Sequence, residues 1–80
     1  MPTILTEGGF RLYFYANERN EPAHVHVDYQ GADAKFWILP VALARNLGMS
    51  AGTLGKAETL VIKHEQLIKE KWDEFFSKKN

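Results

Sequence analysis

The spacing of apolar residues divides the chain into two halves. Up to about residue 39, apolar and polar residues alternate with a period of two, which predicts β-strands. From about Pro40 onward, apolar residues recur at helical spacing. We therefore expect a single α+β domain over residues 1–80, with an antiparallel sheet in residues 1–39 and helices in residues 40–80.

The first half predicts a sheet of three to four antiparallel strands. Residues 10–15, 23–29 and 33–38 alternate clearly, and residues 3–5 form a shorter strand before them. Because side chains alternate across a strand, one face of this sheet is apolar. Its expected members are Phe10, Leu12, Phe14, Ala23, Val25, Val27, Tyr29, Ala34, Phe36 and Ile38.

Gln30 and Gly31 mark the turn between the second and third long strands. A two-residue loop places Asp28 opposite Asp33, whereas a four-residue loop places Asp28 opposite Lys35. Like charges on facing positions repel, so we expect the four-residue loop. Both registers keep the apolar residues on the same face.

The second half predicts a short helix and a long helix, both packed on the apolar face. The short helix begins at Pro40 and ends at Leu47, before Gly48. Ser50 caps the long helix, which runs to about Phe76. The apolar stripe of this helix consists of Leu54, Ala57, Val61, Ile68, Trp72 and Phe75.

Composition and charge limit the classes of function. Ten basic residues balance ten acidic residues, which argues against a strongly basic, non-specific nucleic-acid binder. The absence of cysteine excludes disulfides, thiolate metal ligands and a thiol nucleophile. No apolar run approaches the roughly 20 residues of a membrane span, and no signal peptide is evident, so we expect a cytoplasmic protein.

Several short motifs together resemble the small bacterial proteins of the domain of unknown function 4160 family. The resemblance spans nearly the whole chain and supports the fold, but it implies no reaction. It does suggest a toxin–antitoxin-like gene pairing. The family pattern has two prolines before the first histidine, and Ala23 replaces the second one here. The matching features are residues 1–4, Phe14 and Tyr15, residues 22–27 (Pro-Ala-His-Val-His-Val), Ala34 and Lys35, and Trp72.

The polar face of the predicted sheet carries the candidate chemistry. His24 and His26 lie two residues apart on one strand, with Cα atoms about 6.6 Å apart at about 3.3 Å per residue. We expect both imidazoles to leave the sheet on the same side, toward solvent. The whole face comprises Arg11, Tyr13, Tyr15, His24, His26, Asp28, Lys35 and Trp37.

This face favours recognition of a macromolecule, RNA ahead of protein. Lys35 and Arg11 would hold phosphate. In an RNA-cleaving protein, His24 and His26 would transfer protons, because an imidazole pKa of about 6.5 suits that task near neutrality. The same face is also compatible with binding of a partner protein, since exposed aromatic residues and arginine anchor protein interfaces. The surfaces for base stacking would be Tyr13, Tyr15 and Trp37.

A divalent-metal site is one alternative. His24 and His26 can converge on one zinc ion at about 2.0–2.1 Å per Zn–N bond, with Asp28 as the nearest third ligand. Lys35 and Arg11 on the same face oppose a bound cation. A purely structural role is also compatible, because aromatic and charged cross-strand pairs stabilise sheets.

A DNA-binding helix-turn-helix is a second alternative. Residues 43–54 resemble that motif, with residues 50–60 as the recognition helix. The cations near this helix are few, namely Arg45, Lys56 and Lys63, so we favour a simple connector.

His64 differs from the other two histidines because it falls within the apolar stripe of the long helix. We expect it on the opposite side of the sheet from His24 and His26. A partly buried histidine with a backbone or carboxylate partner is the expected role.

Overall fold

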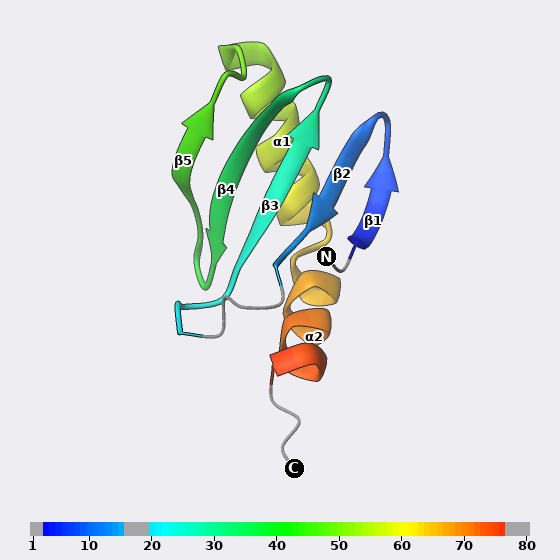
Figure 1. The fold of residues 1–80 in the computed structure, drawn as a ribbon, viewed down its shortest axis with the longest axis vertical. Coiled ribbons are helices and arrows are strands. Elements are labelled where there is room, and N and C mark those ends of the chain that lie inside the picture. Colours follow the sequence, from blue (N-terminus) through cyan, green and yellow to red (C-terminus); the bar gives the residue numbers. More distant parts are fainter. Residues whose placement is uncertain (1–2, 16–19, 77–80) are drawn as a thin grey trace.

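The computed structural model describes residues 3–15 and 20–76 as a five-stranded sheet followed by two helices (Figure 1). Each strand runs antiparallel to the next, in the order β1-β2-β3-β4-β5. The α+β class is confirmed, but the sheet has five strands rather than three or four. The elements are β1 (Thr3–Glu7), β2 (Phe10–Tyr13), β3 (His24–Tyr29), β4 (Ala32–Ile38), β5 (Val41–Leu47), α1 (Ala51–Lys63) and α2 (Glu65–Phe76).

The extra strand is β5, which replaces the short helix predicted for residues 40–47. It pairs with β4, from Val41 opposite Ile38 to Leu47 opposite Asp33. The prediction was wrong because a β-bulge interrupts this pairing and breaks the period-two pattern of β5. Without β5, the backbone groups along that edge of β4 would lack partners, so long-range pairing overrides the local helical spacing.

The turn between β3 and β4 consists of Gln30 and Gly31 alone. Their φ angles are 49° and 87°, and positive values at both central positions define a type I′ turn. Asp28 therefore lies opposite Asp33, and the predicted four-residue loop is wrong. The twist of this turn matches that of the strands, and Asp28 is half-exposed with the Arg11 guanidinium 3.8 Å away, which limits the repulsion.

The predicted apolar face of the sheet is confirmed by burial. The apolar core lies between the sheet and α1, which passes behind β3 and β4 in the view of Figure 1. Ser50 caps α1 as predicted, because its hydroxyl accepts a hydrogen bond from the backbone N–H of Thr53 at 3.2 Å. The central core residues are Leu12, Val25, Val27, Phe36, Ile38, Ala57, Val61 and Ile68.

The long predicted helix is divided at His64. The first part, α1, ends at Lys63, and α2 begins at Glu65. Figure 1 shows that α2 continues beyond the end of the sheet, near the start of β3, rather than lying across its face. None of the helices in the described part of the chain is long and apolar enough to cross a membrane.

Candidate functional site

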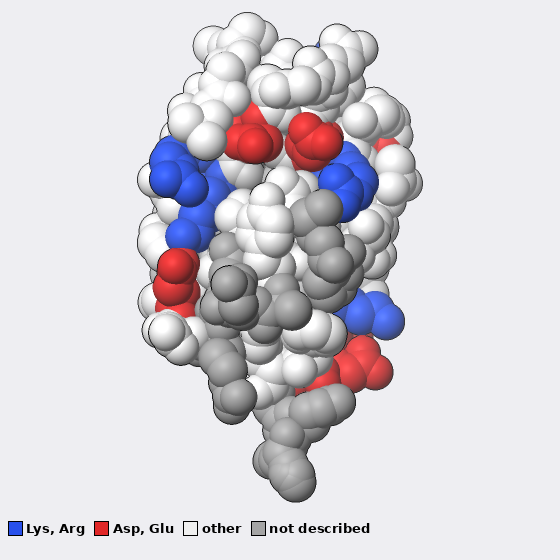
Figure 2. Space-filling model, in the orientation of Figure 1, with Lys and Arg blue, Asp and Glu red and all other residues white. Residues whose placement is uncertain are grey.

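The side of the sheet turned away from α1 is called the open face here, and Figure 2 shows it. Residues on neighbouring strands form rows across it. One row joins Tyr13, His26, Lys35 and Arg45 on four successive strands. The structure therefore places the predicted site residues on one face, and it adds Arg45. The candidate functional residues on the open face are Arg11, Tyr13, Tyr15, His24, His26, Asp28, Asp33, Lys35, Trp37 and Arg45.

His26 lies at the centre of a cluster of rings on the open face. Its ring centroid is 5.3 Å from that of Tyr13, 4.9 Å from that of Tyr15 and 5.2 Å from that of His24. His26 is 9% exposed. Tyr15 is 41% exposed and gives the cluster an accessible aromatic surface.

His24 is completely buried, at 0% exposure. Its ring lies between two indoles, with centroids 4.9 Å from Trp72 of α2 and 5.8 Å from Trp37. The expectation that both imidazoles reach solvent is therefore wrong. The reason is tertiary: α2 extends past the end of the sheet and places Trp72 against the first residue of β3.

The orientation of the His24 ring is set by the chain just before β3. Its Nδ1 atom lies 2.9 Å from the carbonyl oxygen of Pro22 and 3.8 Å from Oε1 of Glu21. A carbonyl oxygen only accepts hydrogen bonds, so we assign the proton to Nδ1, which donates to Pro22. His24 thus fixes the entry of the chain into β3.

Basic groups lie on both sides of the open face, with acidic groups between them (Figure 2). On β2, the Arg11 guanidinium lies 4.4 Å from the ring centroid of Tyr13. On β4, the Lys35 ammonium lies 4.8 Å from the ring centroid of Trp37 and 2.6 Å from Oε1 of Glu21. Both cations are therefore held against aromatic surfaces, where the ring quadrupole attracts them.

Arg45 lies directly opposite Lys35 across the β4–β5 pairing. Within residues 3–15 and 20–76, Arg45 has no ion-pair partner. Sequence reasoning missed Arg45 as part of this face because β5 was predicted as a helix. A proline turn directly after a strand, followed by Val41, was the indication of a returning strand.

The phenol of Tyr13 is strongly held in its neutral form. Burial raises its pKa above the usual value of 10.0, and a hydrogen bond with Tyr15 adds to the effect. The negative charges of Asp33 and Asp28 raise the pKa further. Tyr13 therefore supplies a neutral hydroxyl at the centre of the face.

The structure does not assemble the predicted zinc ligands. No group of three or more His, Cys, Asp or Glu side chains that could hold a metal is found in the described part of the chain. His24 turns its Nδ1 toward Pro22, and the Asp28 carboxylate lies beside Arg11. The helix-turn-helix alternative is also wrong, because the residues of its first helix belong to β5.

His64 has the carboxylate partner that its position predicts. Its Nε2 atom lies 2.9 Å from Oε1 of Glu7, on the helix side of the sheet and away from His24 and His26. The other oxygen of Glu7 accepts a hydrogen bond from Lys63, also at 2.9 Å. These two partners hold the pKa of Glu7 below its usual value of 4.5.

Comparison with known families agrees with the resemblance seen in the sequence. Residues 9–73 match the family model described as Domain of unknown function (DUF4160). The chain belongs to the DUF4160 family. The matched segment begins just before β2 and includes all the candidate functional residues of the open face. No curated protein and no solved structure matches this DUF4160 chain.

Proposed function

We propose that this DUF4160 domain binds single-stranded RNA through its open face. The observation that carries the proposal is the pairing of Lys35 with Arg45 beside the indole of Trp37. Like charges on facing strands destabilise a sheet, and a phosphate between the two cations would relieve this repulsion. A base of the same nucleotide could stack on Trp37, because stacking on aromatic side chains accepts any base.

A second contact would lie on the β2 side of the face. Tyr15 offers an exposed ring there, and Arg11 supplies a positive charge beside Tyr13. Adjacent strands are about 4.8 Å apart, so β2 and β4 are about 10 Å apart. That separation suits a short stretch of extended nucleic acid rather than a long groove.

The ligand must compete with Glu21 for Lys35. The ion pair between them is short, at 2.6 Å, but the Glu21 side chain is 44% exposed. The Lys35 side chain is 15% exposed, so the pair is buried on its lysine side. A phosphate that replaces the carboxylate would restore a charge-assisted hydrogen bond to the same ammonium, which offsets the loss of the Glu21 contact. With a net charge of zero for the whole chain, binding would depend on this local pair of cations.

We propose that the domain binds RNA but does not cleave it. His24 has no exposed surface, so it cannot reach a substrate hydroxyl together with His26 in this conformation. The proposal includes a cytoplasmic location and membership of a toxin–antitoxin-like pair. An RNA ligand is consistent with each.

Titration with a fluorescently labelled ten-nucleotide uridine RNA, followed by anisotropy at low salt, tests the proposal. Lys35→Gln and Arg45→Gln should each weaken binding, whereas Lys69→Gln on α2 should leave it unchanged. Loss of a stacking partner in Trp37→Ala should cost about 1–3 kcal/mol of binding free energy. With two phosphates neutralised, the slope of log K against log salt should be about −1.4.

Two results would overturn this function. One is the absence of RNA binding by the wild-type domain, which would leave the open face as a protein interface. The other is an equal loss of affinity in Lys35→Gln and Lys69→Gln, because that result would describe non-specific attraction to any lysine.

A further inference from the structure

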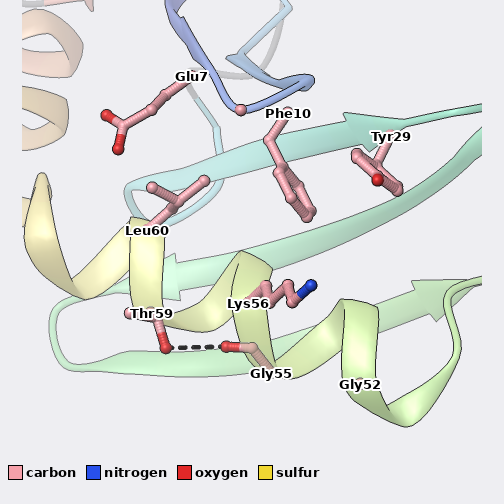
Figure 3. Close-up of a pocket in the computed structure, with 9 residues that line it drawn as sticks. Glu7, Phe10, Tyr29, Gly52, Gly55, Lys56, Thr59 and Leu60 are labelled. Atoms are coloured by element: carbon pink, nitrogen blue, oxygen red, sulfur yellow. Dashed lines mark hydrogen bonds between the residues drawn. The ribbon is translucent and has the colours of Figure 1, made fainter.

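A cleft of about 550 Å³ lies on the helix side of the sheet, between α1 and the adjoining ends of β2 and β3 (Figure 3). Its sheet wall is formed by Phe10 and Tyr29, and its helix wall includes Gly52 and Gly55. Its volume falls within the range of about 300–1,000 Å³ that is common for small-molecule sites. Because Phe10 and Tyr29 belong to the apolar face, this cleft is separate from the open face.

The sheet wall of the cleft is aromatic. The rings of Phe10 and Tyr29 are stacked, with centroids 4.2 Å apart and planes inclined by 20°. Because the two rings cover each other's inner faces and Phe10 is 5% exposed, Tyr29 offers most of the accessible aromatic surface of this wall. Another aromatic ring can pack on it in an offset or edge-to-face arrangement. The shape and chemistry of this wall therefore favour a planar, apolar group.

The charges at the cleft favour an anion. Both oxygens of Glu7 are already bound, by Lys63 and His64. Lys56, in contrast, has no ion pair among residues 3–15 and 20–76. Figure 3 shows Glu7 at one end of the cleft and the Lys56 ammonium pointing toward the side of Phe10 and Tyr29. The cation available to a ligand is therefore next to the aromatic wall.

The helix wall is open because two residues of α1 lack side chains. Neither Gly52 nor Gly55 has a positive φ, and a Cβ atom added at either would have no atom within 4 Å. The fold itself therefore gives no steric reason for glycine at these positions. Glycine costs a helix up to about 1 kcal/mol relative to alanine, and such local conflicts are expected where a binding site must stay open.

We propose that this cleft binds a small aromatic carboxylate. The flat ring would pack against Tyr29, which Phe10 backs, and the carboxylate would accept hydrogen bonds from the Lys56 ammonium. Glu7 at the far end is already paired with Lys63 and His64, so the direction of the ligand is set by Lys56 alone among the charged residues that line the cleft. The proposal is independent of RNA binding, because no residue of the open face takes part.

An NMR titration with 2-naphthylacetate tests the site, with the uncharged 2-naphthylacetamide as the matched probe. The acid should shift the backbone amides of Gly52 and Gly55 saturably. The amide should bind at least about fivefold more weakly, because it lacks the charge that Lys56 recognises. Lys56→Gln should reduce the affinity of the acid to that of the amide, and Lys69→Gln should change nothing.

Gly55→Leu provides a second, steric test. The leucine side chain starts in open space and then enters the cleft, so the variant should fold normally but bind neither probe. Circular dichroism checks its fold. Equal affinity for acid and amide, undiminished binding by Gly55→Leu, or shifts confined to the open face would each overturn the proposal.

Discussion

The Nε2 atom of His64 lies 2.9 Å from Oε1 of Glu7, although 57 positions separate the two residues in the chain. The contact joins the end of β1 to the point where α1 gives way to α2. Lys63 binds the second oxygen of the same carboxylate, so one exposed side chain holds the helix junction against the edge of the sheet. Both contacts lower the pKa of Glu7.

The Glu7 contact predicts a specific dependence of stability on pH. The pKa of Glu7 is lower in the folded protein than in the unfolded chain, so its carboxylate stabilises the fold above pH 4.5. That stabilisation is lost as the pH falls below 4.5 through the folded-state pKa. In urea denaturation, Glu7→Gln should be less stable than wild type at neutral pH, and the two should converge in acid.

Glu58 provides the matched control for this experiment. It is exposed on α1 and has no ion pair within residues 3–15 and 20–76. Glu58→Gln should therefore change the urea midpoint little at either pH. A Glu7→Gln difference that stays constant from neutral pH down to about pH 3 would contradict the assigned cause.

Trp72 is the residue that closes the end of the sheet, and its removal should be severe. It is 8% exposed, and its ring contacts those of His24 and Phe14, with centroids 4.9 and 5.5 Å away. Trp72→Ala should cost about 3–5 kcal/mol of unfolding free energy, and Trp72→Phe should cost less. The total unfolding free energy of a small domain is only about 5–15 kcal/mol, so in a thermal scan the alanine variant should begin to unfold at a much lower temperature than wild type. A wild-type melting curve for Trp72→Ala would refute this role.

The faces of β2, β3 and β4 were predictable because their residue types alternate strictly. Leu12, Val25 and Val27 are fully buried, as the alternation requires. The strand β5 was not predictable in the same way. Its pairing contains a bulge, so its apolar residues lose the period of two, and Val41–Leu47 resembles a helix when read alone.

The burial of His24 shows a different limit of sequence reasoning. Alternation correctly placed His24 and His26 on the same face, and the register confirms it through Trp37 and Lys35. Which part of that face is covered depends on where α2 ends in space. Nothing in the local sequence of β3 carries that information, because the covering ring belongs to Trp72.

Ionisation of Tyr13 should make the stability of the fold depend on pH in the alkaline range, as ionisation of Glu7 does in the acid range. Its charged form is the phenolate, and burial raises its pKa above 10.0 in the folded protein. The contribution of the neutral Tyr13 side chain to stability is fully present below pH 10.0. It is lost as the pH rises from there toward the folded-state pKa. A spectrophotometric titration should show one tyrosine that ionises only when the protein unfolds.

Tyr13→Phe should remove this late ionisation, whereas Tyr29→Phe should preserve it. Tyr29 provides the control because it stacks on Phe10 on the other side of the sheet. Ionisation of all tyrosines near pH 10.0 in the folded protein would contradict the assignment.

Replacing either of the two glycines that line the cleft with alanine should make the protein more stable. Gly52→Ala and Gly55→Ala should each raise the unfolding free energy by about 0.5–1 kcal/mol, because alanine favours the helix and meets no neighbour. For a domain of this size, 1 kcal/mol corresponds to a rise of about 4–8 °C in Tm. Gly48→Ala is the opposing control: its φ is 98°, and its added Cβ would lie 3.4 Å from Ala32, so it should lower Tm. If Gly52→Ala and Gly55→Ala instead destabilise the protein, the glycines serve the fold rather than the cleft.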